Sequence, residues 1–230
     1  MKNSRAPLRP FVRRDDRMVL HMVLVLIVLY ILLALFVVLA GGDTSFDQGI
    51  TLFLQRYHSP FWDAFMEFVS WWAFPGGAVA ILSVCLLFAL RRRWLEVGFM
   101  FAPLLAVPIV SIIKQLFGRA RPTAELVRVV RQFNNESFPS GHVVFYTVLF
   151  GFIAYLMYRH WTMPKYIRIP LAAFSIFLII TVPFSRMYLG AHWFTDVTAG
   201  FALGLVLLIG LVAGYNRVVR ARMAKGAQSS

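Results

Sequence analysis

The chain has 230 residues, of which 60% are hydrophobic and only 14% are charged, and its mean hydropathy is +0.72. This apolar content excludes an ordinary water-soluble domain. Several apolar stretches reach the roughly 20 residues that a helix needs to cross a hydrocarbon core, which favours spanning helices over a barrel of short strands. The net charge of +13 lies in short basic clusters beside these stretches. Such clusters suit membrane lipids and membrane topology, and we expect no nucleic-acid partner.

A basic segment, residues 1–17, precedes the apolar run Met18–Ala40. This run is too long for the apolar part of a secretory signal, and no small-residue cleavage site lies before Gly41. We therefore predict a retained first spanning helix. The single cysteine, Cys85, lies in a later apolar run and excludes an intrachain disulfide.

Apolar runs along the whole chain predict an all-α, polytopic membrane protein with six spanning helices. The predicted helices are Met18–Ala40, Trp72–Leu90, Leu95–Phe117, Val143–Tyr158, Ile169–Phe184 and Thr195–Val212. They form one domain, residues 18–216, and a basic tail, residues 217–230, follows. We expect the end of this tail, Ala224–Ser230, to be disordered.

Basic residues gather on the side of the membrane where an even number of spans places both termini. They are Lys2, Arg5, Arg9, Arg13, Arg14, Arg17, Arg91, Arg92, Arg93, Arg159, Lys165, Arg168, Arg217, Arg220, Arg222 and Lys225. By the positive-inside rule this side is the cytoplasm. We therefore expect a multi-pass protein of the plasma (inner) membrane with both termini cytoplasmic.

The first outer loop, Gly41–Trp71, is acidic on balance, as expected for a translocated segment. The spacing of its apolar residues suits a short interfacial helical segment between the first two spanning helices. Two interpretations of this segment stay open. It is either a lid or rim through which lipid reaches a site, or simple interfacial packing with Trp and Tyr as anchors.

The second outer loop departs from the charge rule, because four arginines follow Lys114 on the side that should be poor in basic residues. They are Arg119, Arg121, Arg128 and Arg131. This excess of positive charge requires an anionic partner, which a phosphate-bearing substrate would supply. Arg119 is equally consistent with a phosphate contact and with pairing to a lipid headgroup or to an acid such as Glu125. For Arg128 and Arg131, a solvated basic loop and contact with a second phosphate both stay open.

Three outer segments have compositions that suit phosphate binding. In the first, six residues separate Lys114 from Arg121, and the two supply a compact positive charge and a planar, bidentate guanidinium. The second, Pro139–His142, has the sequence PSGH and precedes the fourth helix. Ser140 is expected to cap that helix, with backbone N–H groups near Gly141 facing an anion.

The third segment follows the fifth helix, with five residues between Arg186 and His192 and three between His192 and Asp196. If the sixth helix begins about a turn earlier than predicted, His192 and Asp196 lie on one face, and the carboxylate holds the imidazole in one tautomer. The pair is similar to the His–Asp half of a hydrolase triad. Here the other imidazole nitrogen would attack phosphorus directly.

The three motifs are complete, in order and correctly spaced, and over about Trp94–Val212 the chain resembles the type 2 phosphatidic acid phosphatase superfamily. The resemblance implies that His192 is the nucleophile that forms a phosphohistidine and that Asp196 orients it. His142 is implied to protonate the leaving oxygen and then to activate water. The residues implied to hold the non-bridging phosphate oxygens are Lys114, Arg121, Ser140, Gly141 and Arg186.

The same resemblance implies a six-helix membrane phosphatase domain that uses no metal and no other cofactor. The expected substrate is a lipid phosphate, such as phosphatidylglycerophosphate, phosphatidate or undecaprenyl diphosphate, which enters from the bilayer to an active site facing the periplasm or cell exterior. A phosphotransferase that passes phosphate to a lipid or sugar acceptor stays open, because the acceptor does not alter the motifs. A non-catalytic transporter or scaffold is disfavoured by the intact motif residues. The sequence does not predict the oligomeric state.

Overall fold

A computed structural model describes residues 16–39 and 45–228. Within these ranges the chain forms helices and loops without a strand, which confirms the all-α prediction. The elements are α1 (Asp16–Leu39), α2 (Ser45–Gln55), α3 (Pro60–Trp71), α4 (Pro75–Leu90), α5 (Trp94–Phe99), the 3₁₀ helix η1 (Ala102–Leu105), α6 (Ala106–Phe117), α7 (Gly141–Arg159), α8 (Lys165–Tyr188) and α9 (Phe194–Gln228). The expectations for residues 1–15, for residues 40–44 of the first outer loop and for residues 229–230 lie outside the described residues.

Five segments are long and apolar enough to cross a membrane. A sixth span results if α3 and α4, which meet at a bend of 50°, are taken as one broken span. The described residues therefore hold five spans, or six with the bent pair, and the chain is a multi-pass membrane protein.

The fifth predicted helix is four residues longer at each end in the structure, as α8, and three other predicted helices are bent, divided or extended. The second predicted helix starts at Pro75, three residues later than expected, because the chain bends after α3. The third is divided into α5, η1 and α6, since Pro103 at the start of η1 has no N–H to continue α5. The sixth continues as α9 to Gln228, because helix-favouring Arg, Ala, Met and Lys residues follow its apolar part. The prediction of a disordered tail from Ala224 is thus wrong as far as Gln228.

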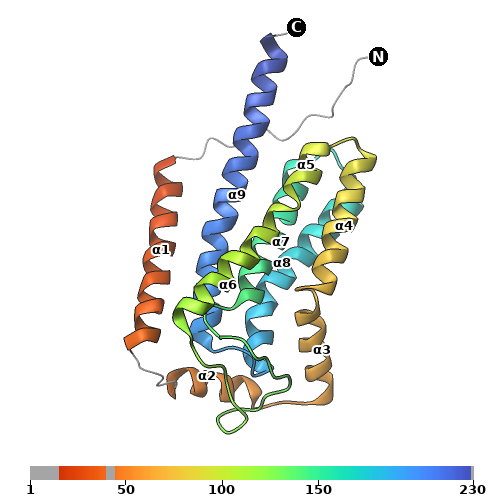
Figure 1. The fold of residues 1–230 in the computed structure, drawn as a ribbon. Helices are drawn as coiled ribbons and strands as arrows, with labels where there is room; N and C mark the ends of the chain where they lie inside the picture. Colours follow the sequence, from red (N-terminus) through yellow and green to blue (C-terminus); the bar gives the residue numbers. More distant parts are fainter. Residues whose placement is uncertain (1–15, 40–44, 229–230) are drawn as a thin grey trace.

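The central helix of the bundle is α7, which packs against α8 and α9 and is buried over most of its length (Figure 1). By contrast, α1 packs against α9 at the edge of the bundle, and most of its apolar side chains are exposed. Because its backbone hydrogen bonds are internal and its exposed side chains are apolar, this surface suits contact with acyl chains.

Two glycines on α9 allow it to cross α7 closely at the end where both helices begin. A Cβ at Gly200 would lie 2.8 Å from the backbone oxygen of Ser140, and one at Gly204 would lie 2.7 Å from the Thr147 side chain. Small residues four apart are a common device for close helix packing in membranes. The approach lets the Ser140 N–H donate to the Asp196 carbonyl at 3.0 Å, which joins the second and third sequence motifs.

The start of α1 and the end of α9 lie at one end of the bundle, whereas α2 lies across the other end (Figure 1). On α2 the polar side chains face inward: Asp47, Thr51 and Gln55 are buried, while Phe46 and Phe53 are exposed. A helix of a water-soluble protein shows the reverse pattern. This orientation is expected for a helix that lies between polar protein groups and lipid.

Candidate active site

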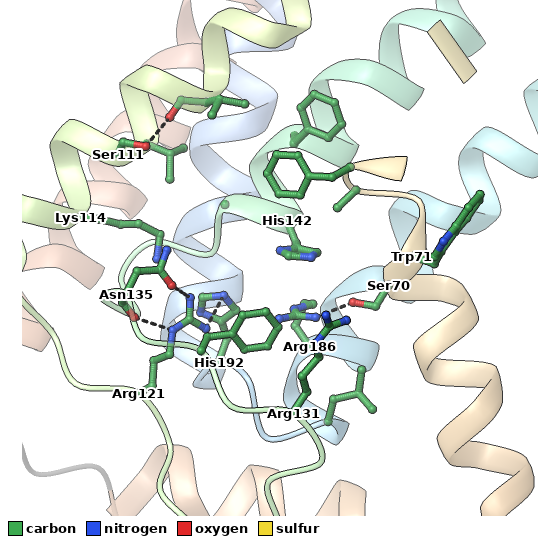
Figure 2. Close-up of a pocket in the computed structure, with 18 of the residues that line it drawn as sticks. Ser70, Trp71, Ser111, Lys114, Arg121, Arg131, Asn135, His142, Arg186 and His192 are labelled. Atoms are coloured by element: carbon green, nitrogen blue, oxygen red, sulfur yellow. Dashed lines mark hydrogen bonds between the residues drawn. The ribbon is translucent and has the colours of Figure 1, made fainter. Parts of the chain in front are cut away.

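The three motifs meet around a cavity of about 510 Å³ at the end of the bundle that α2 covers. Six of the predicted site residues line it: Lys114, Arg121, Gly141, His142, Arg186 and His192. Figure 2 shows the histidines and cationic side chains converging on this space from α6, α7, α8 and the loops between the helices. Asp196 and Ser140 are fully buried behind the lining. Arg119 also lies outside it.

The two ring nitrogens of His192 face different surroundings. Nδ1 lies 3.6 Å from Oδ2 of Asp196 and 3.3 Å from the Ser137 hydroxyl, which itself donates to the same Asp196 oxygen at 2.5 Å. Nε2 lies 3.2 Å from Nη1 of Arg121, on the side of the cavity. A hydroxyl and a carboxylate therefore hold one nitrogen, while the other faces the cationic cavity.

The helix start at α9 fixes the carboxylate of Asp196. Asp196 lies in the first turn and accepts a hydrogen bond from the Trp193 N–H at 2.9 Å. This contact is one half of a capping box, in which an acid in the first turn satisfies the N–H that precedes the helix. The first turn of α9 thus holds the Asp196 carboxylate near His192, which lies just before the helix.

Burial and positive charge together lower the pKa of His192 well below its ordinary value near 6.5. Burial has the largest effect, followed by the charges of Arg121, Arg186 and Lys114. Each disfavours a charged imidazolium. His192 is therefore neutral at pH 7, which is the form that can act as a nucleophile.

Arg121 is held in place by three oxygens around its guanidinium. It donates to the backbone oxygen and the side-chain oxygen of Asn135 at 2.6 and 2.7 Å, and to the Ala191 carbonyl at 2.5 Å. Burial lowers its pKa to about 10, so the side chain stays protonated at pH 7. The guanidinium is thus a fixed positive charge beside His192.

Two further cations approach the cavity from α6 and α8. Lys114 is buried, and its amine donates to the carbonyls of Glu136 and Ser137. Arg186 is 2% exposed and donates through Nη1 to the Ser70 hydroxyl, while its Nε and Nη2 have no hydrogen-bond partner among the described residues. Buried donors of this kind need an acceptor, and a phosphate oxygen is a suitable one.

Phe133 is a site residue that the sequence motifs do not indicate. Its ring centroid lies 4.9 Å from the guanidinium carbon of Arg121, 5.0 Å from that of Arg186 and 5.9 Å from that of Arg131. The electron-rich ring lies among three positive charges that otherwise repel one another. Phe133 also lines the cavity, and its ring centroid lies 6.4 Å from that of the His142 ring.

The start of α7 differs in one respect from the expectation. Ser140 lies at the N-cap position, but its hydroxyl makes no capping hydrogen bond and has no partner among the described residues. The predicted cap is therefore absent, because the hydroxyl is not turned toward the N–H groups of the first turn. Gly141 and His142 follow in the first turn of α7 and line the cavity.

The remaining outer arginines have different surroundings. Arg119 donates to Asp47 and Asp196, which favours the interpretation that it pairs with acids, although Glu125 is not one of them. Arg128 forms a bidentate pair with Asp63 of α3, a contact that raises the pKa of Arg128. Arg131 lines the cavity, so of the two it is the one placed to meet a second anionic group.

No group of three or more His, Cys, Asp or Glu side chains within residues 16–39 and 45–228 is arranged to hold a metal ion. The groups that line the cavity are mainly positively charged or neutral, with Glu67 as the acidic member. They are poor ligands for a hard divalent cation, which prefers carboxylate oxygens.

Comparison with known proteins identifies the family. Residues 94–220 match the PAP2 superfamily, and this range includes all three motifs. The chain belongs to the PAP2 superfamily. The resemblance seen in the motifs is thereby confirmed over more than half of the chain.

Curated relatives within the PAP2 superfamily act on lipid phosphates. The chain is 28% identical over 179 residues to the lipid A 4'-phosphatase of Bacteroides thetaiotaomicron, which covers 70% of this chain and 73% of the relative. It is 25% identical over 185 residues to an undecaprenyl-diphosphatase of Sulfolobus acidocaldarius, which covers 78% and 84%, respectively. Both are phosphatases of lipid phosphates.

A solved PAP2 structure has the same fold. The phosphatidylglycerolphosphate phosphatase of Bacillus subtilis superposes with a TM-score of 0.74 at 20% sequence identity, over 86% of this chain and 98% of that one. At this identity the match concerns the fold alone. It agrees with a PAP2 membrane bundle.

Some residues outside the motifs contact motif side chains, among them Ser70, Phe133, Asn135 and Ser137. Ser137 and Asn135 lie just before the PSGH segment, so their position in the sequence could have indicated that they lie near the site. Ser70 is far from every motif in sequence and reaches the site only through the packing of α3 against α8.

Proposed function

We propose that the protein is a lipid phosphatase that removes a phosphate group from a lipid phosphomonoester or diphosphate through a phosphohistidine. The observation that carries the proposal is the position of His192, with a carboxylate and a hydroxyl at Nδ1 and a cation-lined cavity at Nε2. This arrangement keeps the second nitrogen unprotonated and pointed at the place where an anionic phosphate is attracted.

In the first chemical step, Nε2 of His192 attacks phosphorus and the bond from phosphorus to the leaving oxygen breaks. His142 gives a proton to that oxygen. In the second step, His142 takes a proton from water, which attacks phosphorus and breaks the phosphorus–nitrogen bond. Inorganic phosphate leaves, and both histidines return to their starting protonation states.

The cations supply the electrostatic part of the mechanism. The unpartnered Nε and Nη2 of Arg186 would donate to non-bridging phosphate oxygens, and Lys114 and Arg121 stand on the opposite side of the cavity. Fixed charges in a site closed to bulk water stabilise the charge of the transition state strongly. Because these side chains already neutralise the phosphate, no metal is needed in this scheme.

The cavity wall supports access from the bilayer. The apolar part of the cavity lining includes Val107 and Val110 of α6 and Trp71 and Phe74 at the bend between α3 and α4. Trp71, Phe74 and Val107 are also exposed on the surface, and an apolar lining that reaches the surface suits an acyl or prenyl chain. The phosphate would then meet the cations while the lipid tail stays in the membrane.

We further propose that the site faces the periplasm or the cell exterior and that both termini are cytoplasmic. The arginines at 91–93 and the basic end of α9 lie at the end of the bundle away from α2. The positive-inside rule assigns that end to the cytoplasm. The α2 helix would then lie at the outer interface.

A phosphate-release assay in detergent tests the proposed function, with phosphatidate, phosphatidylglycerophosphate, undecaprenyl diphosphate and a soluble phosphomonoester as substrates. We expect release from at least one lipid, little from the soluble ester, no loss with excess chelator, and no release by His192→Ala. Activity that requires a divalent metal, or that survives His192→Ala, would refute the scheme. Transfer of phosphate to an added lipid or sugar alcohol in place of water would support a phosphotransferase.

The same assay can test whether Arg131 binds a second phosphate of the substrate. Because it lines the cavity beyond Phe133, it is placed to bind a second phosphate. Arg131→Gln is expected to lower kcat/KM about tenfold for a diphosphate lipid and less than threefold for a monophosphate, since a charged hydrogen bond contributes roughly 1.5–3 kcal/mol. Equal losses for both substrates would remove Arg131 from the headgroup site.

A further inference from the structure

A buried chain of charged groups connects the interfacial helix α2 to the site. It runs from Asp47 of α2 through Arg119 to Asp196 of α9. The side chains are 1%, 9% and 0% exposed, respectively. Buried carboxylates are costly unless they are paired and hydrogen-bonded, so each member needs the others.

We propose that Asp47 and Arg119 are positioning residues for the carboxylate of Asp196, and hence that α2 is part of the catalytic machinery. This inference rests on the proposed role of His192 as the nucleophile. It gives α2 a role beyond the two interpretations that the sequence left open, a lipid rim and an interfacial anchor.

Asp47 completes the start of α9 from a different helix. Its Oδ1 accepts the backbone N–H of Thr195 at 2.9 Å, and its Oδ2 accepts the Thr195 hydroxyl at 2.8 Å. The first N–H groups of a helix have no partner within the helix, and a carboxylate there also interacts favourably with the helix dipole. Asp47 therefore holds the first turn of α9, which carries Asp196.

Arg119 fixes the rotation of the Asp196 carboxylate. Its Nη1 binds Oδ1 of Asp196 at 2.5 Å, while its Nη2 binds Asp47 at 2.7 Å. With Oδ1 held in this way, Oδ2 faces Ser137 and His192. A guanidinium shared between two carboxylates cannot move toward either one without losing the other, so the three groups fix one another.

The network also sets the charge behind His192. The two carboxylates and the guanidinium sum to one negative charge, whereas Asp47→Asn leaves no net charge and Arg119→Gln leaves two negative charges. The other charged or titratable groups that face His192 are Lys114 of α6, Arg121 of the loop, His142 of α7 and Arg186 of α8. Neither variant alters them, so the two substitutions shift the electrostatic potential at His192 in opposite directions.

The experiment compares kcat and KM of purified full-length wild type, Asp47→Asn and Arg119→Gln on one lipid phosphate. Groups that orient a metal-ligating side chain typically contribute about 10- to 100-fold to activity, and we expect an effect of similar size for groups that orient Asp196. We expect kcat to fall by about this factor in both variants while KM changes less than about threefold, because Lys114, Arg121 and Arg186 are unaltered. Asp63→Asn is the matched control, since it removes an acid–arginine pair from the next helix, and it should retain nearly full kcat.

A second readout follows His192 itself, through the pH dependence of its carbethoxylation by diethyl pyrocarbonate, measured by peptide mass spectrometry. The reagent modifies the neutral imidazole. We expect the midpoint to move to higher pH in Arg119→Gln, where added negative charge stabilises the imidazolium, and not to rise in Asp47→Asn. A structural role alone would lower the yield of folded protein without moving the midpoint.

Wild-type kcat in both variants, a fall matched by Asp63→Asn, or an unchanged midpoint in Arg119→Gln would overturn the proposal. Failure of both variants to give monodisperse protein in detergent would also overturn it, because the network would then serve folding alone. His192→Ala separates this inference from the proposed function. If His192→Ala is inactive while Asp47→Asn is fully active, only the inference fails; if His192→Ala is active, the proposed function fails.

Discussion

At the scale of single residues, the surroundings of His192 distinguish it from an ordinary buried histidine. A buried neutral histidine needs an acceptor for one ring nitrogen and a donor for the other, and here Nε2, beside the Arg121 guanidinium, also faces a cavity. The cations nearby oppose protonation of the ring and, in the proposed scheme, attract the anionic substrate. In that scheme, one group of charges both keeps the imidazole neutral and holds the phosphate.

The lowered pKa of His192 gives a prediction about pH. Because burial and three cations disfavour the imidazolium, protonation of His192 requires a pH below the ordinary histidine value near 6.5. The nucleophilic form is therefore present above that value and is lost only as the pH falls further. Carbethoxylation of His192 in the wild-type protein should have its midpoint below pH 6.5, and a midpoint above 6.5 would contradict the electrostatic description.

The proposed contact of Arg121 with phosphate can be tested with Arg128 as a control, since both arginines lie in the loop between α6 and α7. Arg121→Lys keeps the charge but loses the fork that meets Asn135 and the cavity. We expect kcat/KM to fall about tenfold to a hundredfold, since hydrogen bonds to charged groups contribute roughly 1.5–3 kcal/mol. Arg128→Lys, whose partner is Asp63, should change it less than about threefold. Similar losses in both would mean that loop folding, and not phosphate contact, is being measured.

At the scale of elements, the site depends on the crossing of α7 and α9. The crossing brings the PSGH segment against the helix start that carries Asp196, and Gly200 leaves no room for a side chain there. The inward polar face of α2 adds a second constraint, because Gln55 hydrogen-bonds the backbone of Arg128 and Tyr188. The crossing therefore positions the starts of α7 and α9, and α2 joins the loop at Arg128 to the end of α8 at Tyr188.

Gly200→Ala tests the helix crossing, with Gly210→Ala as its control on the same helix. The new methyl group at position 200 would meet backbone atoms, which cannot move aside as a flexible side chain would. Overpacking of this kind costs about 1–3 kcal/mol, so we expect a lower thermal midpoint in detergent and reduced kcat. A Cβ at Gly210 meets nothing within 4 Å, and its replacement should leave both unchanged or raise stability. Equal behaviour of the two variants would contradict the packing described for the crossing.

At the scale of the whole molecule, the cavity and the basic turn at 91–93 lie at opposite ends of the bundle. The end with the basic turn at 91–93 holds the start of α1 and the end of α9, whereas the opposite end holds the cavity and α2. If the cavity end is the outer one, as proposed, its arginines oppose the positive-inside rule locally, and the basic clusters at the other end would set the topology.

Sidedness can be measured with single cysteines in a Cys85→Ala background. Tyr57, between α2 and α3, is 76% exposed at the site end, and Arg92 is exposed at the other end. In intact bacterial cells, a membrane-impermeant maleimide should label Tyr57→Cys, and it should label Arg92→Cys only after permeabilisation. The reverse pattern would place the active site in the cytoplasm.

Local sequence signals predicted a large part of this molecule. Long apolar runs predict most of the helices, and the motif residues Lys114, Arg121, His142 and His192 line one cavity, because each motif lies at a helix end or in an adjoining loop. Contacts between distant segments could not be predicted in the same way. Asp47 and Thr195, which form a hydrogen bond, are 148 positions apart in the sequence. The ion pair between Arg119 and Asp47 depends on α2 turning its polar face inward, which the local sequence does not show.

In the proposed mechanism, His192 carries the phosphate during turnover. The most direct measurement is to incubate the protein with a lipid labelled in its terminal phosphate, quench it with alkaline detergent within one turnover, and locate the label by peptide mass spectrometry. We predict label on His192 that is stable in alkali and lost in acid, as expected of a phosphorus–nitrogen bond, and no label in His192→Ala. Label on a serine or an acidic residue, or unimpaired turnover by His192→Ala, would contradict the account.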